Sequence, residues 1–161
     1  MKPLILLDID GVLNPVVNPD QGEGPELILS KANVALVRRL SACGRIAWVS
    51  TWPANSTTRL ESQLQLYVEP LRVTLVLRPS DRQMPTPKLR SVDRWLARME
   101  ALEEADWDSV VWIDDVLGRD ARAWAQSYDR PVLLQKPTPA EGLTADHVTS
   151  VEVFIHGGAG N

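Results

Sequence analysis

Residues 4–13, LILLDIDGVL, decide the fold of this chain. Residues 4–7 form a continuous apolar run, which is typical of a strand buried on both faces. Asp8 and Asp10 follow it, and because side chains alternate along extended backbone, they point to the same side. Two carboxylates on one side repel each other unless a cation lies between them. The stretch therefore predicts a buried strand whose carboxyl end carries a charged site.

Length and composition indicate one globular domain. The chain has 161 residues, of which 44% are hydrophobic and 24% charged, which is the range of folded soluble domains. We expect a single domain over residues 1–156 and a flexible tail over 157–161. The net charge of −4 gives no general attraction for nucleic acid or an anionic membrane, and no apolar run is long enough to span a bilayer. The single cysteine, Cys43, excludes an internal disulfide and fits a reducing, cytoplasmic location.

Strand-like and helix-like segments alternate along the rest of the chain. Strands are predicted over residues 46–49, 71–77, 110–113 and 132–134, and helices over 30–42, 55–66, 88–99, 120–126 and 144–155. Loops are predicted over 14–29, which is rich in Asn, Pro and Gly, and over 78–87, where two prolines flank Thr86. This alternation predicts an α/β fold with a doubly wound, Rossmann-like, mostly parallel sheet and helices on both faces. Ligands of such sheets bind outside the carboxyl ends of the strands.

Polar side chains stand at the positions that this fold brings to that edge. They are Asp8, Asp10, Ser50, Thr51, Lys88, Asp114 and Asp115. Taken alone, each has an ordinary structural explanation, such as a turn, a solvated lysine or a helix cap. Their common placement at strand ends and at one helix start favours a functional explanation.

The chemistry of this set suggests phosphoryl transfer. Mg²⁺ prefers carboxylate oxygens together with water and a substrate phosphate, and Asp8, Asp10 and one of Asp114 or Asp115 offer such ligands. A carboxylate can attack phosphorus to form an aspartyl-phosphate. A second carboxylate can protonate the leaving group and then activate water. A hydroxyl group and a lysine would hold the phosphoryl oxygens.

The motifs resemble those of the haloacid dehalogenase superfamily of phosphohydrolases. LILLDIDGVLNP is similar to the first motif of that family, and the resemblance implies that Asp8 is the nucleophile and Asp10 the general acid/base. In the same order, Ser50 in IAWVST matches the phosphate-binding hydroxyl, with Thr51 as its competitor, and Lys88 matches the third-motif lysine. Asp114 and Asp115 match the acidic metal-binding motif, and either could be the direct ligand. Asp10 argues against dehalogenation, since the true dehalogenases lack this aspartate.

The spacing of the motifs leaves no room for a separate cap domain. Predicted elements occupy the segments between Asp10 and Ser50 and between Ser50 and Lys88. Resemblance to the capless members implies an open site, which suits large substrates such as phosphoproteins or nucleic-acid ends. The segments LDIDGVLNP and WVSTW also resemble the phosphatase-type domains associated with RNA-repair proteins. Trp52, in the second segment, would lie near the mouth of the site.

The sequence thus predicts a Mg²⁺-dependent phosphomonoester hydrolase that forms an aspartyl-phosphate. Its expected partner is a phosphorylated substrate, either a small molecule or a nucleic-acid end, and no membrane. Two alternatives are phosphotransfer to an acceptor other than water and a non-catalytic module that binds phosphate.

Overall fold

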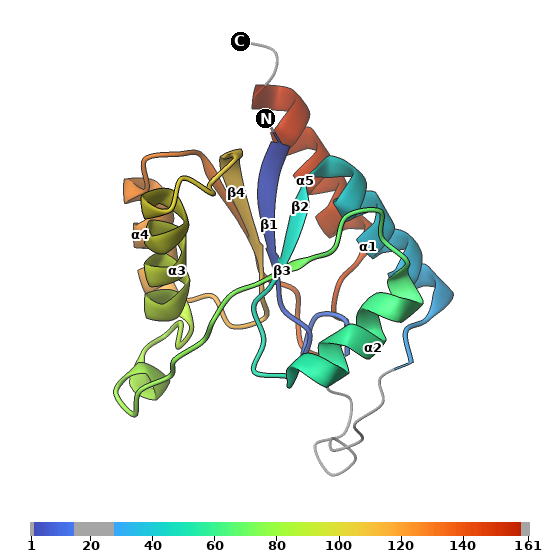
Figure 1. Cartoon of the computed structure of the whole chain (residues 1–161), viewed down its shortest axis with the longest axis horizontal. Helices are drawn as coiled ribbons and strands as arrows, with labels where there is room; N and C mark the ends of the chain where they lie inside the picture. Colours follow the sequence, from blue (N-terminus) through green and yellow to red (C-terminus); the bar gives the residue numbers. More distant parts are fainter. Residues whose placement is uncertain (1, 15–27, 159–161) are drawn as a thin grey trace.

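A five-stranded parallel sheet forms the centre of the molecule (Figure 1). The structure, a computed structural model, describes residues 2–14 and 28–158. The order of the strands across the sheet is β3-β2-β1-β4-β5. Their bounds are β1 (Lys2–Leu7), β2 (Arg45–Trp48), β3 (Leu71–Arg72), β4 (Trp107–Ile113) and β5 (Val132–Gln135). Strand β1, which contains the apolar run of residues 4–7, is therefore central and pairs with β2 on one side and β4 on the other.

Helices cover both faces of this sheet. They are α1 (Lys31–Cys43), α2 (Ala54–Leu64), α3 (Leu89–Ala101), α4 (Arg119–Ser127) and α5 (Ala145–Gly158), with a short 3₁₀ helix, η2 (Asp81–Gln83). Figure 1 shows α1, α2 and α5 on one side of the sheet and α3 and α4 on the other. The doubly wound α/β fold predicted from the sequence is confirmed. No helix among the described residues is long and apolar enough to cross a membrane.

The alternation of side chains along β1 divides the core into two layers. Ile5 and Leu7 pack in the cluster that includes residues of α1, α2 and α5. Leu4 and Leu6 pack in the cluster that includes residues of α3 and α4. All four side chains are fully buried, which explains why this strand is apolar at every position rather than at every second one.

Helix α1 begins and ends where the sequence indicates. The Ser30 hydroxyl accepts a hydrogen bond from the backbone N–H of Asn33, as an N-cap does. At the other end, the backbone N–H of Gly44 donates to the carbonyl of Leu40. Gly44 also packs against β1, because a Cβ at this position would lie 2.2 Å from the carbonyl oxygen of Pro3. The return from α1 into β2 therefore requires a residue without a side chain.

The strand predicted over residues 71–77 is wrong in its length. Only Leu71–Arg72 is assigned to β3 in the sheet. Beyond it, the backbone of Val76 bonds to α3 instead of a strand, since its N–H donates to the Ser91 hydroxyl and its carbonyl accepts from Arg90. Helix side chains thus satisfy the groups that a ladder would have used.

Two predicted segments lie partly outside the described residues. Of the loop predicted over 14–29, residues 15–27 are not described. Of the tail predicted over 157–161, the first two residues form the end of α5, and 159–161 are not described.

We predict that Gly44→Ala lowers the free energy of unfolding by about 1–3 kcal/mol, because the new methyl group overpacks the contact with Pro3. Gly157→Ala is the control, since a Cβ there has nothing within 4 Å. It should leave stability unchanged or raise it by up to about 1 kcal/mol, as alanine replaces glycine in a helix. Urea unfolding of both variants measures the difference. Equal stability of the two variants would contradict the packing role of Gly44.

Candidate active site

Two buried carboxylates emerge at the carboxyl edge of the sheet on the face covered by α3. Asp8 continues the row of Leu4 and Leu6 along the β1 strand, and Asp114 continues the row of Val110 and Trp112 along β4. Their exposed fractions are only 3% and 1%. Strand alternation thus brings both side chains to the layer where α3 begins.

The ammonium group of Lys88, the residue before α3, lies between these carboxylates. Its Nζ donates to Oδ1 of Asp8 at 2.8 Å and to Oδ2 of Asp114 at 3.0 Å. It also donates to the backbone carbonyl of Val49, which follows β2, at 3.0 Å. An ammonium has three protons to donate, so each has a partner. One cation joins the ends of three neighbouring strands.

The pKa values of Asp8, Asp114 and Lys88 are shifted by burial and by the charges of these three side chains on one another. Burial, together with the nearby charge of Asp114, raises the pKa of Asp8 to about 8, despite the opposing effect of Lys88. Burial also raises the pKa of Asp114. Burial alone would lower the pKa of Lys88, but the charges of Asp114 and Asp8 more than offset this and leave it raised. Two carboxyl groups therefore share one ammonium group that stays charged. A further cation bound beside them would be electrostatically favourable.

A third carboxylate completes a cluster suited to a metal ion. One carboxylate oxygen from each of Asp8, Asp114 and Asp115 lies within 4.8 Å of the others. Gly11 makes this possible: its φ is +78°, and a Cβ there would lie 2.3 Å from Oδ2 of Asp115. Both aspartates of the acidic pair belong to the cluster, so the structure does not single out one of them.

Asp10, which the sequence placed among the candidate metal ligands, has different surroundings from Asp8. The cluster does not include its carboxylate. Asp10 is exposed, and its Oδ2 accepts a hydrogen bond from Nε1 of Trp52 at 2.9 Å, with a longer bond of 3.4 Å from Asn14 to Oδ1. The aspartates of the first motif therefore separate into one buried and one solvent-facing group.

The two hydroxyl candidates also differ in their surroundings. Ser50 is 5% exposed, and its Oγ accepts a hydrogen bond from the backbone N–H of Trp52 at 3.1 Å. Its own proton is thus left to be donated to a ligand. Thr51 is exposed. Of the two hydroxyl candidates, Ser50 is thus the buried one and Thr51 the exposed one.

Three residues around the site were not predicted from the sequence: Gly11, Thr86 and Asp120. Gly11 directly follows Asp10, but nothing in the sequence shows that the side chain of Asp115 approaches it closely. Thr86 precedes Lys88 and bonds to Asp120, which is 34 residues away. Pairings over such distances leave no local pattern in the sequence.

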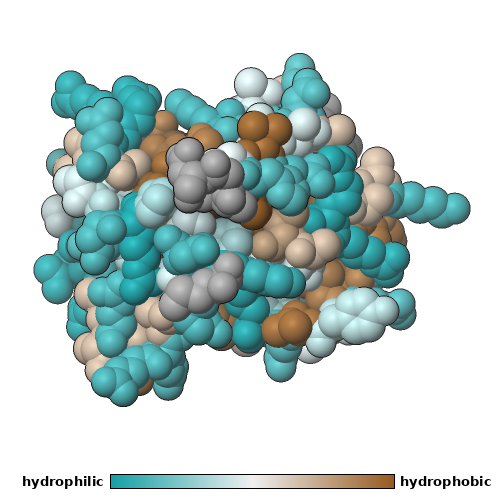
Figure 2. Space-filling model, turned by 90° about the horizontal axis from the view of Figure 1, so that it is seen from above, coloured by the Kyte–Doolittle hydropathy of each residue, from teal (hydrophilic) through white to brown (hydrophobic). Residues whose placement is uncertain are grey.

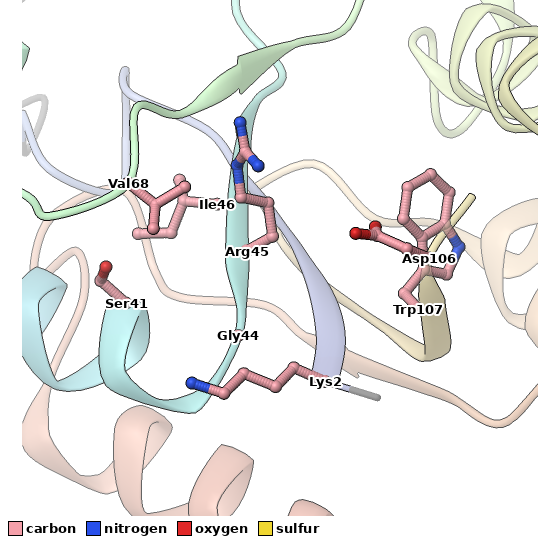
Figure 3. A pocket seen from close by; sticks show the side chains of 8 residues that line it. All are labelled: Lys2, Ser41, Gly44, Arg45, Ile46, Val68, Asp106 and Trp107. Carbon is pink, nitrogen blue, oxygen red and sulfur yellow. The ribbon is translucent and has the colours of Figure 1, made fainter. Parts of the chain in front are cut away.

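At the opposite edge of the sheet, the described residues form a pocket but no comparable charged cluster. A cavity of about 330 Å³ there is lined by residues that include Lys2, Arg45 and Asp106. Figure 3 shows that the ammonium of Lys2 and the guanidinium of Arg45 point apart, so they do not converge on one ligand. Figure 2 shows this end of the molecule as mainly hydrophilic, with small separate hydrophobic areas. At the carboxyl edge, by contrast, the charged side chains of Asp8, Lys88 and Asp114 do converge.

Comparisons with known proteins agree with this architecture. The family model described as the HAD domain in Swiss Army Knife RNA repair proteins matches residues 4–148. No curated protein matches the chain. Among solved structures, the HAD domain of the effector protein Lem4 from Legionella pneumophila is similar, with a TM-score of 0.56 and 10% sequence identity. The match covers 94% of this chain and 93% of the Lem4 domain, and at this identity it supports the fold alone.

We predict that the metal-free protein becomes less stable as pH rises from 5 to 8. Asp8 has a folded pKa of about 8 against an ordinary value of 3.8, so between these values the folded state holds a proton that the unfolded chain has released. This contribution to stability is complete below pH 4 and is lost as pH rises through 8, with a slope of up to about 1.4 kcal/mol per pH unit.

Urea unfolding in a chelating buffer across this pH range measures the effect. Asp8→Asn should flatten the dependence, whereas Asp108→Asn, which removes an exposed carboxylate near the amino end of β4, should keep it. Identical slopes for the wild type and Asp8→Asn would contradict the assignment.

Proposed function

This chain belongs to the family of HAD domains found in Swiss Army Knife RNA repair proteins, and we propose that it is a Mg²⁺-dependent phosphomonoester hydrolase that works through an aspartyl-phosphate. The observation that carries the proposal is the contact of Lys88 with both Asp8 and Asp114. It supports the proposal because the residues proposed as nucleophile, phosphate-binding cation and metal ligands lie together at the carboxyl edge of the sheet.

In this proposal Asp8 is the nucleophile. Its Oδ1 is held by Lys88 and by the backbone N–H of Ile9 at 2.8 Å. Among the described residues, none donates a hydrogen bond to Oδ2, which leaves this oxygen to attack phosphorus. Because Oδ1 is fixed on two sides, the free oxygen keeps one orientation at the strand end, as an efficient attack requires.

Asp10 serves as the general acid and then as the general base. In the first step Oδ2 of Asp8 bonds to phosphorus, the bond from phosphorus to the ester oxygen breaks, and that oxygen takes a proton from Asp10. In the second step a water molecule gives a proton to Asp10 and attacks phosphorus. The bond from phosphorus to Asp8 breaks, and inorganic phosphate leaves. The exposed position of Asp10, held by Trp52, suits contact with both the leaving group and water.

Ser50 and Lys88 bind the phosphoryl oxygens. The Ser50 hydroxyl has a free proton because its oxygen already accepts from the backbone. Lys88 contributes a positive charge, whose attraction for the phosphoryl oxygens is stronger where water is excluded. Thr51, on the exposed side of the same strand end, would bind phosphate only from the rim of the site.

The carboxylates fit a magnesium ion. Asp8, Asp114 and Asp115 offer hard oxygen ligands close to one another, which is the donor type that Mg²⁺ requires. When bound, Mg²⁺ supplies positive charge that favours the ionised form of Asp8 and screens it from the phosphate. The close approach of Asp115 over Gly11 supports its inclusion in this set.

The substrate we propose is a phosphate at the end of a large molecule. The described residues between Ser50 and Lys88 form α2, β3 and η2, and these elements build no separate domain over the site. We infer an open site that accepts a polymer end. The RNA-repair proteins named in the family description make nucleic-acid ends the first substrates to test.

We predict that Asp8→Asn abolishes hydrolysis of both aryl and alkyl phosphates in Mg²⁺. Asp10→Asn should lower kcat/KM on an alkyl phosphate by about 10²–10⁴-fold, because an alkoxide leaves poorly without a proton. Its effect on 4-nitrophenyl phosphate should be much smaller, since that leaving group needs no acid. Steady-state kinetics measure both, with Asp108→Asn as the unaffected control. Full activity of Asp8→Asn would remove the nucleophile assignment.

We predict hydrolysis of oligonucleotides that carry a terminal phosphate, with a higher kcat/KM than for small phosphomonoesters. Phosphate release from 5′- and 3′-phosphorylated oligonucleotides, compared with aryl and sugar phosphates, tests this. Inactivity on both oligonucleotides, with turnover of small esters, would remove the nucleic-acid substrate and keep the phosphatase.

A further inference from the structure

The loop before Lys88 is held by a side chain from α4. Thr86 is 2% exposed, and its hydroxyl donates to Oδ1 of Asp120 at 2.7 Å while its backbone N–H donates to Oδ2 at 3.1 Å. The Thr86 hydroxyl in turn accepts a hydrogen bond from the backbone N–H of Gly118 at 2.7 Å. The carboxylate of Asp120 thus binds both the backbone and the side chain of one buried residue.

Close packing accompanies these hydrogen bonds. A Cβ at Gly118 would lie 2.3 Å from the Cβ of Pro85, so the loop that enters α3 lies directly against the loop that enters α4. The second loop leaves β4 through Asp114. The contact between Thr86 and Asp120 therefore fixes the segment that carries Lys88 relative to the segment that carries Asp114.

The start of α3 depends on this contact because no side chain caps the helix there. Lys88 occupies the N-cap position, where no side chain caps the helix. The carbonyl of Thr86 instead accepts from the backbone N–H of Leu89 at 3.1 Å. Lysine has a long, flexible side chain. Its ammonium group can therefore reach its three hydrogen-bond acceptors together only if the backbone of Lys88 is held in place.

The charge of Asp120 agrees with this role. Burial raises its pKa, but the hydrogen bonds from Thr86 outweigh burial and leave the pKa lowered. The carboxylate is therefore ionised and accepts from both Thr86 groups. An amide at this position would lose one acceptor.

From these contacts we propose that Thr86 and Asp120 are positioning residues, which hold Lys88 between Asp8 and Asp114. The kinetic consequences rest on the phosphatase function proposed above, whereas the position of the ammonium group does not. Neither residue forms a hydrogen bond with the carboxylates of the cluster, so the effect that we propose acts through the position of Lys88 relative to them.

The direct test observes the lysine ammonium groups by NMR on ¹⁵N-lysine-labelled protein. The chain's lysines are Lys2, Lys31, Lys88 and Lys136, and Lys88→Met identifies the signal of interest. The Lys88 ammonium should exchange slowly with water because its protons are hydrogen-bonded and largely buried. Thr86→Val and Asp120→Asn should speed this exchange at least tenfold. Thr86→Ser, which keeps the hydroxyl, and Asp108→Asn should retain slow exchange.

A double-mutant cycle tests the kinetic consequence on 4-nitrophenyl phosphate, with circular dichroism to confirm that each variant is folded. Thr86→Val should lower kcat/KM about tenfold in the wild type and have no further effect in Lys88→Met, with Thr86→Ser restoring activity. If Lys88→Met has no measurable turnover, the same cycle is run on the affinity for inorganic phosphate.

The possible outcomes separate the two proposals. Unchanged Lys88 exchange in folded Thr86→Val would overturn the positioning role, as would equal losses in the two backgrounds of the cycle. Faster exchange in Thr86→Val, in a protein that hydrolyses no phosphomonoester, would support the positioning role and contradict the phosphatase function.

Discussion

The site depends on one constraint: two buried aspartates must share the charge of a single lysine. Asp8 and Asp114 lose their hydration at the end of the sheet, and such a loss costs several kcal/mol for each charge unless a partner is near. The ammonium of Lys88 meets both carboxylates and the carbonyl of Val49. The start of α3 is therefore tied to β1, β2 and β4 at the point where their ends meet. In the metal-free protein Asp8 holds a proton below about pH 8, and a bound cation would favour its ionised form.

The order of the strands explains why this point exists. The chain adds β2 and β3 on one side of β1, then crosses to add β4 and β5 on the other. The connections that follow β1 and β4 thus lead to opposite sides of the sheet, which makes the ends of these two strands the switch point at which doubly wound sheets bind ligands. Asp8 and Asp114 directly follow these two paired strands. The apolar core needs side chains on both faces of β1, and its alternation sends Asp8 toward α3.

The sequence predicted the fold, and it singled out residues that the structure brings to one edge of the sheet, but it did not predict how their side chains are arranged. Continuous apolar runs predict buried parallel strands, and charged residues directly after them predict the functional edge. The length of β3 could not be predicted, because side chains of α3 compete for the backbone of Val76. The direction of Asp10 depends on Trp52, which is 42 residues away, and the contact of Thr86 with Asp120 is equally non-local. Such pairings arise only when the helices dock on the sheet.

We propose that Asp8 itself takes the phosphoryl group. The most direct measurement is to quench the protein with acid during turnover of a phosphomonoester, reduce it with borohydride, and map the modified peptide by mass spectrometry. An acyl phosphate is reduced to an alcohol, whereas a free carboxylate is not. We expect homoserine at position 8 and unmodified aspartate at position 10. Turnover that leaves Asp8 unmodified while another residue is reduced would contradict it.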